Sequence, residues 1–490
     1  MPSRHVSLPR FRTAADRERA ALEQSLAALR DELELPGDFS PEALAEAATA
    51  QPDAPGTDLR DLPFSTLDPL GSKDLDQAFH LARSRRGFTV RYAIADVPGF
   101  VRPGGALDAE ARHRGQTIYL PDGSIPLHPR PLSEGRASLL PSEDRTAYVW
   151  TIELDSDGAQ IGVRVERAQV RSRAQRDYAS AQREVDGGRA DEQLGLLREV
   201  GTLRIAQERA RGGASLPMPE EEIVADPADG YRIERRSVLA VEDWNAQLSL
   251  LTGMAAAELM IAGGTGILRT MPKPDESAIA RFRSQVAALG HPWAADVDYG
   301  EFLRGIDGSA PESVPLLQAA SALFRGAGYT PFDGTAPEQP AQAAIAAPYA
   351  HVTAPLRRLV DRWGLAICAA ISAETPIPEW ARTSLPDLPD LMRTSAQRAS
   401  RAEASALDRI EAALLAPSLG EWRTALVVDA NPTRARLLLD DPPVVASAEI
   451  ADAKPGSRIR VRVASADIAT GRISLAAPDS EDSQPVAATG

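Results

Sequence analysis

The pattern of hydrophobic positions in residues 1–58 is helical. Leucines and alanines in residues 14–34 recur at a spacing of three and four, which predicts an amphipathic helix. The stretch "FSPEALAEAA" predicts a second helix, with Ser40 as its N-cap and Pro41 in its first turn. "QPDAPGTD" at 51–58 has the composition of a linker. We therefore expect residues 1–58 to form a small helical N-terminal domain, which could be helix-turn-helix-like.

The central region mixes strands with helices. In "GFTVRYAIAD", Phe88, Val90, Tyr92 and Ile94 occupy every second position and share one side of a predicted strand. "AFHLARS" precedes this strand across an Arg-Gly turn, so the two segments predict a hairpin. Further strands are predicted in 145–172, and helices in 190–212, 243–262, 275–290, 313–326, 355–374 and 388–415. This mixture predicts an α+β domain over residues 59–416, with helices around a β-sheet core.

The pattern changes again after residue 416. "WRTALVVD", "RARLLLD", "VVASAEI", "SRIRVRVASAD" and "GRISLAAP" are short strands separated by turn residues. About five strands in roughly 60 residues are typical of a small barrel of the OB type. We expect an OB-fold barrel at 417–478, followed by a polar, disordered tail at 479–490.

Charge and composition narrow the class of protein. The formal net charge of −15 argues against nonspecific nucleic-acid binding by the whole surface, although it leaves room for a basic groove. No run of about 18 uncharged apolar residues is present, and the first residues lack the apolar core of a signal peptide, so we expect no membrane contact. Cys368 is the only cysteine, which excludes an internal disulfide and favours the cytoplasm. We also expect a monomer.

Arginine supplies nearly all of the positive charge. Lysine occurs only at positions 73, 273 and 454 among the 54 basic residues. Arginine forms paired hydrogen bonds to phosphate, so this bias would suit a phosphate-binding protein. A GC-rich genome gives the same bias, and this alternative is the favoured one on composition alone.

The first candidate site is acidic. "LDPLGSKDLDQAF" places Asp68, Asp74 and Asp76 within nine residues. Carboxylates that repel one another become favourable together when they bind a divalent cation, and magnesium prefers such oxygen ligands. A solvated acidic turn is the alternative, and the two stay equally open on these residues.

The second candidate site is basic. In "YAHVTAPLRRLVDRW", Pro355 can open a helix, which would place Arg357 and Arg358 in its first turn. Acidic residues are normally preferred there, so two arginines predict an anion site. The alternative is that Arg357 only pairs with Asp361 four residues later.

A third candidate lies in the predicted helix 388–415. Glu403 has helical spacing with apolar residues in "SAQRASRAEASALDRIEAALL". A buried carboxylate needs an arginine or a ligand hydroxyl as its partner, whereas a glutamate at the edge of the apolar stripe reaches solvent. Tyr119 in "RGQTIYLPDG" is either a core aromatic or a surface on which a base stacks. Both pairs of alternatives stay open.

Taken together, these motifs resemble the RNB catalytic domain of the ribonuclease II and ribonuclease R family. The resemblance runs from about Leu62 to Pro417, and the predicted barrel matches the C-terminal RNA-binding barrel of the family in position. It rests on "LDPLGSKDLDQAF", on "YAIADVPGFVRPGGALDAEARHRGQTIYLPDGSIPLHPRPLSEGRASLLP", on "ILRTMP" and on "YAHVTAPLRRLVD". The resemblance implies a magnesium-dependent hydrolytic exoribonuclease. Such an enzyme threads single-stranded RNA and releases nucleoside 5′-monophosphates processively from the 3′ end.

The resemblance also assigns roles to residues. Asp68, Asp74 and Asp76, with Gln77 beside them, resemble the ligands of one or two Mg²⁺ ions, and Asp76 resembles the one whose loss harms the chemistry most. Arg357 resembles the arginine near the scissile phosphate. The residues that resemble RNA contacts are Tyr119, Tyr178, His351, Arg358 and Glu403.

Three positions depart from the family pattern. Gln77 stands where the family usually has a fourth aspartate, which puts the second metal in doubt. "EDWNAQLSLLTGM" lacks the common Glu-Glu pair, which puts discrimination against DNA in doubt, and Leu216 or Pro217 replaces a second aromatic. The departure at Gln77 motivates the alternative of a catalytically weak RNA-binding relative that protects or delivers 3′ ends. A phosphohydrolase of small phosphoesters is disfavoured by the length of the resemblance and by the barrel.

Overall fold

A six-stranded sheet forms the centre of the larger domain. The computed structural model describes residues 16–217, 220–226, 230–236, 238–308, 310 and 313–477. The sheet runs in the order β1-β8-β2-β3-β4-β7, and β8 also pairs with β7. Its strands are β1 (Thr57–Asp58), β2 (Phe64–Asp68), β3 (Gln77–Arg83), β4 (Gly87–Ala95), β7 (Asp144–Asp155) and β8 (Gln160–Asp177). Because β8 pairs with β7 up to Arg171 and with β2 from Ser172 onward, the sheet closes on itself.

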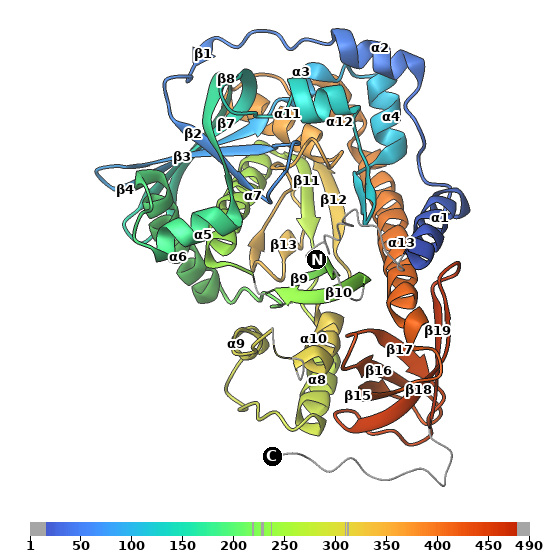
Figure 1. The fold of residues 1–490 in the computed structure, drawn as a ribbon. Coiled ribbons are helices and arrows are strands. Elements are labelled where there is room, and N and C mark those ends of the chain that lie inside the picture. The colour runs from blue at the N-terminus through green and yellow to red at the C-terminus, as the bar shows by residue number, and fades with distance from the viewer. Residues whose placement is uncertain are drawn as a thin grey trace.

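The predicted hairpin is confirmed as β3 and β4. Phe88, Val90, Tyr92 and Ile94 lie in one hydrophobic core together with Trp150 of β7, as their alternation predicts. Helices from later in the chain contribute to the same core, chiefly α6 (Glu192–Arg211), α7 (Ala240–Gly263) and α11 (Asp361–Ser372). Figure 1 shows these helices beside the sheet in the upper part of the molecule.

Helix α7 is long and apolar enough, by length and composition alone, to cross a membrane, and among the described residues it is the only such helix. Just over half of its most apolar window, 56%, is buried inside the protein. It packs against α6, α11 and β11 (Thr265–Thr270). The core helix of a soluble protein passes the same test of length and composition.

The other elements surround this centre. They are α3 (Val97–Phe100), α4 (Ala106–Arg114), β5 (Ile118–Leu120), β6 (Gly123–Ile125), α5 (Tyr178–Asp186), β9 (Glu220–Asp226), β10 (Gly230–Arg236), α8 (Glu276–Ala288), α9 (Tyr299–Arg304), α10 (Val314–Ala320), β12 (Gly328–Asp333), β13 (Ala341–Gln342), β14 (Ala347–Pro348), α12 (Glu379–Thr383) and α13 (Leu388–Leu415). A π-helical turn, η1 (Leu132–Arg136), and the 3₁₀ turns η3 (Ser321–Phe324), η4 (Leu385–Asp387) and η5 (Ala416–Ser418) join them. The hairpin β9–β10 and the pair β11–β12 were not predicted from the sequence.

The N-terminal helices lie against the larger domain. They are α1 (Asp16–Glu32) and α2 (Pro41–Thr49), and the predicted cap of α2 is confirmed, because the Ser40 hydroxyl accepts a hydrogen bond from the Ala43 N–H at 3.2 Å. α2 packs against α4, and α1 packs against α13. Figure 1 shows α1 beside α13, above the barrel.

Helix α1 contacts three separate parts of the chain. Arg409 of α13 donates to the Ser25 hydroxyl at 2.8 Å and to Glu32 at 2.6 Å. The Ser25 hydroxyl donates to the carbonyl oxygen of Ile468 in the barrel at 2.8 Å. Arg30 forms a two-point ion pair with Asp122, at 2.8 and 2.9 Å, in the turn between β5 and β6. One helix thus joins α13, the barrel and the larger domain.

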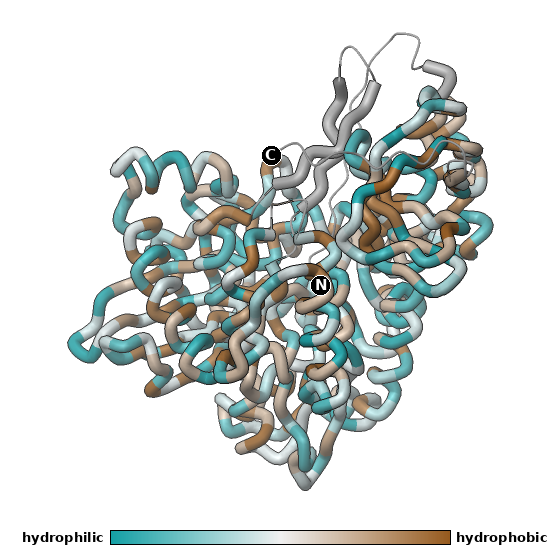
Figure 2. The backbone as a smooth tube through the Cα atoms, turned by 90° about the horizontal axis from the view of Figure 1, so that it is seen from below, coloured by the Kyte–Doolittle hydropathy of each residue, from teal (hydrophilic) through white to brown (hydrophobic). Residues whose placement is uncertain are grey.

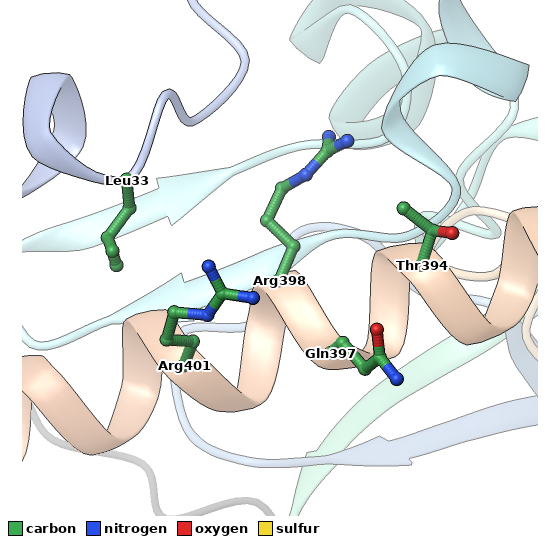
Figure 3. Close-up of a pocket in the computed structure, with 5 residues that line it drawn as sticks. All are labelled: Leu33, Thr394, Gln397, Arg398 and Arg401. Atoms are coloured by element: carbon green, nitrogen blue, oxygen red, sulfur yellow. The ribbon is translucent and has the colours of Figure 1, made fainter.

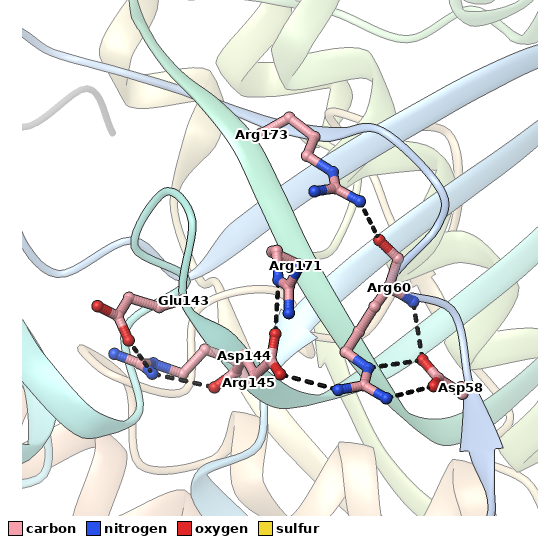
Figure 4. Close-up of polar contacts among 7 residues, drawn as sticks. All are labelled: Asp58, Arg60, Glu143, Asp144, Arg145, Arg171 and Arg173. Carbon is pink, nitrogen blue, oxygen red and sulfur yellow. Dashed lines mark hydrogen bonds and ion pairs between the residues drawn. The ribbon is translucent and has the colours of Figure 1, made fainter.

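The prediction of a linker over residues 51–58 is wrong at its C-terminal end, because Thr57 and Asp58 form β1, which pairs with β8. Ion pairs hold this strand in place (Figure 4): Arg60 bonds Asp58 at 2.6 Å and Asp144 at 2.9 Å, and Arg171 bonds Asp144 at 2.6 Å. Turn-forming residues such as Pro and Gly predicted a loop here, but the edge of β8 offered backbone partners to this segment.

The C-terminal barrel is confirmed. Its five strands, β15 (Trp422–Ala430), β16 (Ala435–Leu439), β17 (Val445–Ala448), β18 (Arg458–Asp467) and β19 (Arg472–Ala476), close in the order β15-β16-β17-β19-β18. Leu437, Val461 and Val463 are fully buried in its own core. Figure 2 shows hydrophobic stretches, in brown, gathered inside the lobe at its upper right, where the barrel lies. The predicted disordered tail, 479–490, lies outside the described residues.

Candidate active site

The acidic motif forms an anchored loop between two strands. Asp68 is the last residue of β2, and Asp76 comes directly before β3. The Ser138 hydroxyl accepts from the Leu75 N–H at 3.0 Å and donates to the Lys73 carbonyl oxygen at 2.6 Å. Residues that bridge two strands and bond to a third segment have little freedom, so the carboxylates are held on a rigid scaffold.

Two motifs that lie 280 residues apart in the sequence meet at Asp76. This aspartate is 3% exposed, and its Oδ1 accepts from the Leu356 N–H at 2.8 Å. Its Oδ2 lies 3.4 Å from Nε of Arg357, whose side chain is 45% exposed. The guanidinium therefore contacts a buried carboxylate on one side and solvent on the other, which leaves donors for an incoming anion.

Burial dominates the electrostatics of the aspartates. It raises the pKa of Asp68 to about 7, with Asp74 adding to the rise and Arg357 opposing it. Burial also raises the pKa of Asp76 well above its usual value, against the opposing effect of Arg357 and of the Leu356 N–H. A positively charged neighbour would therefore stabilise the ionised forms of both carboxyl groups.

The donor chemistry of these residues fits magnesium. Oδ2 of Asp68 is buried and has no hydrogen-bond partner among the residues that the structure describes, which is costly unless a cation or water binds there. In the same described part of the chain, no group of three or more Asp, Glu, His or Cys side chains lies close enough together to hold a metal ion. The aspartates would therefore have to draw closer around an ion.

Gln77 is held by its amide nitrogen. It opens β3, and its Nε2 donates a short hydrogen bond to the carbonyl oxygen of Thr353, just before the arginine motif. Because the nitrogen is used, the amide oxygen is the only atom of this side chain that is free to bind a cation. A neutral oxygen contributes less to cation binding than a carboxylate would.

Two tyrosines flank the acidic loop. Tyr119 lies on β5 and donates from its hydroxyl to Oδ2 of Asp74 at 3.3 Å. Tyr178 begins α5, and its hydroxyl accepts from Nδ2 of Asn245 at 3.4 Å. Both residues are partly exposed, so Tyr119 is not a fully buried core residue, and its use as a stacking surface stays a prediction. The partly exposed rings leave aromatic surface at the site.

The arginine motif differs from the prediction. The helix begins at Asp361 rather than at Pro355, so Arg357 and Arg358 lie in the turns before it and the helix-dipole argument does not apply to them. The pairing of Arg357 with Asp361 is also wrong, because Arg358 takes Asp361 in a two-point ion pair at 2.8 and 2.9 Å. Asp361 fits the first position of a helix, where negative charge is favoured.

The remaining predicted RNA contacts are His351 and Glu403. His351 shares a hydrogen bond of 2.7 Å between its Nδ1 and the hydroxyl of Tyr329. Glu403 is exposed on α13, beside a buried stripe that includes Ala402 and Ala406, so the alternative of an edge residue that reaches solvent is confirmed. Among the described contacts, none joins Glu403 to the aspartates or to Arg357.

Several supporting residues carry no recognisable sequence signal. Thr353 orients Gln77, and Asn245 connects Tyr178 to the carbonyl oxygen of Leu67 at 3.3 Å. His128 is 2% exposed and forms a hydrogen bond to the backbone of Pro355, next to the arginine motif. None of these residues stands in a charged or periodic pattern, so only the folded chain identifies them.

Because His128 is buried, we predict that the folded protein loses stability in mild acid. Burial and the charge of Arg362 lower its pKa from 6.5 to about 3, so the unfolded chain binds the proton more tightly than the folded one. Stability should therefore rise with pH between about 3 and 6.5, with up to about 1.4 kcal/mol per pH unit from this residue. Urea unfolding of the wild type and of His128→Gln, from pH 5 to 7.5, would measure it. A difference between the two proteins that does not vary with pH would contradict the prediction.

Comparisons with known proteins identify the family to which this chain belongs. The RNB domain family matches residues 56–365, and the C-terminal S1 domain of RNase II-type exonucleases matches residues 422–477. The first match covers more than half of the chain, so the chain belongs to the RNB family, which confirms the resemblance.

Individual relatives agree with this assignment. Ribonuclease R of Escherichia coli (strain K12) is 31% identical over 337 residues, which are 65% of this chain and 40% of that protein. The chain spans about two fifths of the length of the curated relatives it matches. The structure of Mycoplasma genitalium RNase R in complex with ribose-methylated single-stranded RNA matches with a TM-score of 0.83 at 20% identity, over 94% of this chain and 78% of that one. Yeast Ssd1, described as a pseudonuclease, matches with a TM-score of 0.65 at 15% identity, over 87% of this chain and 53% of that one.

Proposed function

We propose that this protein is a magnesium-dependent 3′-to-5′ exoribonuclease that hydrolyses single-stranded RNA processively to nucleoside 5′-monophosphates. The observation that carries the proposal is the contact of Arg357 with buried Asp76. Arg357 also acts electrostatically on Asp68, whose Oδ2 has no hydrogen-bond partner among the described residues. Neighbouring carboxylates that can draw together around a cation, next to a half-exposed arginine, suit a reaction at a phosphodiester. We further propose that the protein acts as a monomer in the cytoplasm.

The residues of the site have separable roles in this proposal. Asp68, Asp74 and Asp76 would hold one or two Mg²⁺ ions, with the amide oxygen of Gln77 as a further neutral donor. Bound magnesium supplies an activated water and neutralises charge on the phosphate and on the leaving oxygen. Arg357 directs its free donors at the phosphate oxygens, where negative charge gathers as the water attacks.

RNA binding rests on aromatic surface and on the barrel. The partly exposed rings of Tyr119 and Tyr178 can stack on bases of any sequence, at roughly 1–3 kcal/mol per base. We assign the RNA 3′ end to the space between these rings and Arg357, with Arg358, His351 and Glu403 as further contacts. One structural neighbour was solved in complex with single-stranded RNA, which supports RNA as the ligand.

A magnesium titration would test the proposal. Purified protein, 5′-labelled single-stranded RNA and a chelator control, resolved on a gel at single-nucleotide resolution, should show metal-dependent shortening to one short end product. Chromatography should identify nucleoside 5′-monophosphates as the released product. A DNA strand of the same sequence would measure the discrimination that the missing Glu-Glu pair puts in doubt. Hydrolysis of a small phosphodiester with no dependence on RNA length would replace the proposal with a phosphohydrolase.

The second candidate is a catalytically weak RNA-binding protein that protects or delivers 3′ ends. Gln77 favours it, because an amide tied to Thr353 stands where the family has a charged ligand. The pseudonuclease among the structural neighbours shows that this fold also occurs without nuclease activity. If this second candidate is correct, the protein should bind RNA but leave it uncleaved at every magnesium and manganese concentration.

Gln77→Asp separates the two candidates. If the protein is a nuclease, the added carboxylate should lower the magnesium concentration for half-maximal rate several-fold, because charge raises cation affinity. If the protein only binds RNA, the wild type should be inactive and the variant should gain activity. Gln77→Asn is the matched control, since it alters length without adding charge. An equal effect of both variants would show that the lost bond to Thr353, rather than the charge, is responsible.

A further inference from the structure

A small pocket lies between α13 and the chain that leaves α1. Its volume is about 130 Å³, and its described lining residues are Leu33, Thr394, Gln397, Arg398 and Arg401. Figure 3 shows both arginines reaching from α13 to the same side of the helix. Two guanidinium groups, an amide and a hydroxyl are donors that suit phosphate oxygens, and none of the described lining residues is acidic.

The positive charge of this pocket is unbalanced. Within the described part of the chain, Arg398 donates only to the carbonyl oxygen of His113, at 3.2 Å, and Arg401 has no hydrogen bond or ion pair. The neighbouring arginines of α13 are paired, Arg393 with Asp390 and Arg409 with Glu32. Like charges three residues apart on a helix destabilise it, so an anion between them is favourable.

The pocket is connected to the aspartate cluster through one short segment. His113 contacts Arg398, and further along the chain the Thr117 N–H donates to the carbonyl oxygen of Arg357 at 3.0 Å. Tyr119 then contacts Asp74. Six residues span at most about 22 Å, which limits the separation of His113 and Tyr119. A single RNA strand can therefore reach both places.

We propose that Arg398 and Arg401, with Thr394 and Gln397, bind a backbone phosphate of single-stranded RNA upstream of its 3′ end. The inference rests on the proposed function, because it takes RNA as the ligand. Arg401 is exposed, so a phosphate held there keeps room for the strand to continue on both sides. Leu33 offers an apolar contact to the adjoining ribose or base. On a protein with a net charge of −15, RNA binding needs local positive sites of this kind, because the net charge repels phosphate.

The test is a binding measurement that does not depend on cleavage. A 5′-fluorescent single-stranded RNA of 20 nucleotides is titrated with full-length protein in chelator, at several salt concentrations. Arg401→Gln should weaken binding about three- to tenfold and reduce the slope of log Kd against log salt by about 0.7, the value for one lost phosphate contact on a single strand. Arg398→Gln should act in the same direction. Arg393→Gln is the matched control, because it removes the same charge from the same helix outside the pocket.

The outcomes separate the inference from the proposed function. Equal affinity and salt slope for Arg401→Gln and Arg393→Gln, with thermal unfolding unchanged, would overturn the inference even if the wild type cleaves RNA. Loss of affinity in Arg401→Gln alone would support it even if the wild type proves unable to cleave. Phosphate added at constant ionic strength distinguishes the source of the anion. Thermal stabilisation by phosphate that Arg401→Gln abolishes, with RNA affinity unchanged by the substitution, would assign the pocket to a small anion and overturn the inference.

Discussion

Asp76→Asn is expected to lower the rate of monophosphate release by about 10³-fold or more while RNA binding stays within about threefold of the wild type. The reason is that the amide keeps the shape and the hydrogen bond from the Leu356 N–H but removes the charge that holds a cation. Cation stabilisation supplies several kcal/mol to such reactions, and each 1.4 kcal/mol is a factor of ten in rate. Single-turnover cleavage of labelled RNA, with binding measured in chelator, would test both parts.

The control for this variant is Asp390→Asn. Asp390 lies on α13 with its side chain 84% exposed, so the same chemical change there should leave the rate as it is. The Asp76 variant should also fold, because the amide removes a buried charge. If more than a tenth of the activity remained, Asp76 would not be the central carboxylate. If a folded variant lost RNA binding, its role would be in binding instead.

Arg357→Gln is expected to lower turnover by about 10²–10³-fold, the range seen when one donor to a developing oxyanion is removed. Arg357→Lys keeps the charge but loses the planar pair of donors, so it should recover only part of the rate. Turnover at saturating RNA, set against KM, separates the chemical step from binding. A change in KM alone would show that Arg357 binds RNA without acting on the reacting phosphate.

The contact between Arg357 and Asp76 determines how the effects of Asp76→Asn and Arg357→Gln on the rate should combine. Arg357 lies 3.4 Å from Asp76 and opposes the rise in the pKa of both Asp68 and Asp76. Removing the arginine should therefore make the aspartates harder to ionise, and the magnesium concentration for half-maximal rate should increase. The effects of Asp76→Asn and Arg357→Gln should be less than additive, because the two residues act as a unit.

Local patterns predicted the fold better than the site. The alternation in β4 and in the barrel strands determines which side chains are buried, and the Ser40 cap is a contact between close neighbours, so each could be read from a few residues. The start of α11 was mispredicted because Pro355 can open a helix, whereas Asp361 provides the better first turn. The sequence could not decide whether Glu403 is buried or exposed. The centre and the edge of an apolar stripe on a helix are only one residue apart, so spacing does not separate them.

The site itself depends on contacts that no local pattern encodes. Asp76 and Leu356 are 280 positions apart, so their hydrogen bond could be expected only through the resemblance to a family and not from spacing. Arg358 and Arg357 look equivalent in the sequence, yet one faces Asp361 and the other Asp76. Which arginine is available to a substrate is therefore decided by the turns of residues 355–360, which only the folded chain specifies.

Helix α1 is synthesised long before the segments that cover it. Its Ser25 hydroxyl bonds a carbonyl oxygen 443 residues further along the chain, at Ile468. At a synthesis rate of roughly 5–20 residues per second, this partner emerges from the ribosome about 20 to 90 s after the helix does. Leu22, Leu26 and Leu29, which are almost fully buried in the finished protein, remain uncovered by α13 for most of that time. The apolar face of α1 is therefore accessible to chaperones during translation.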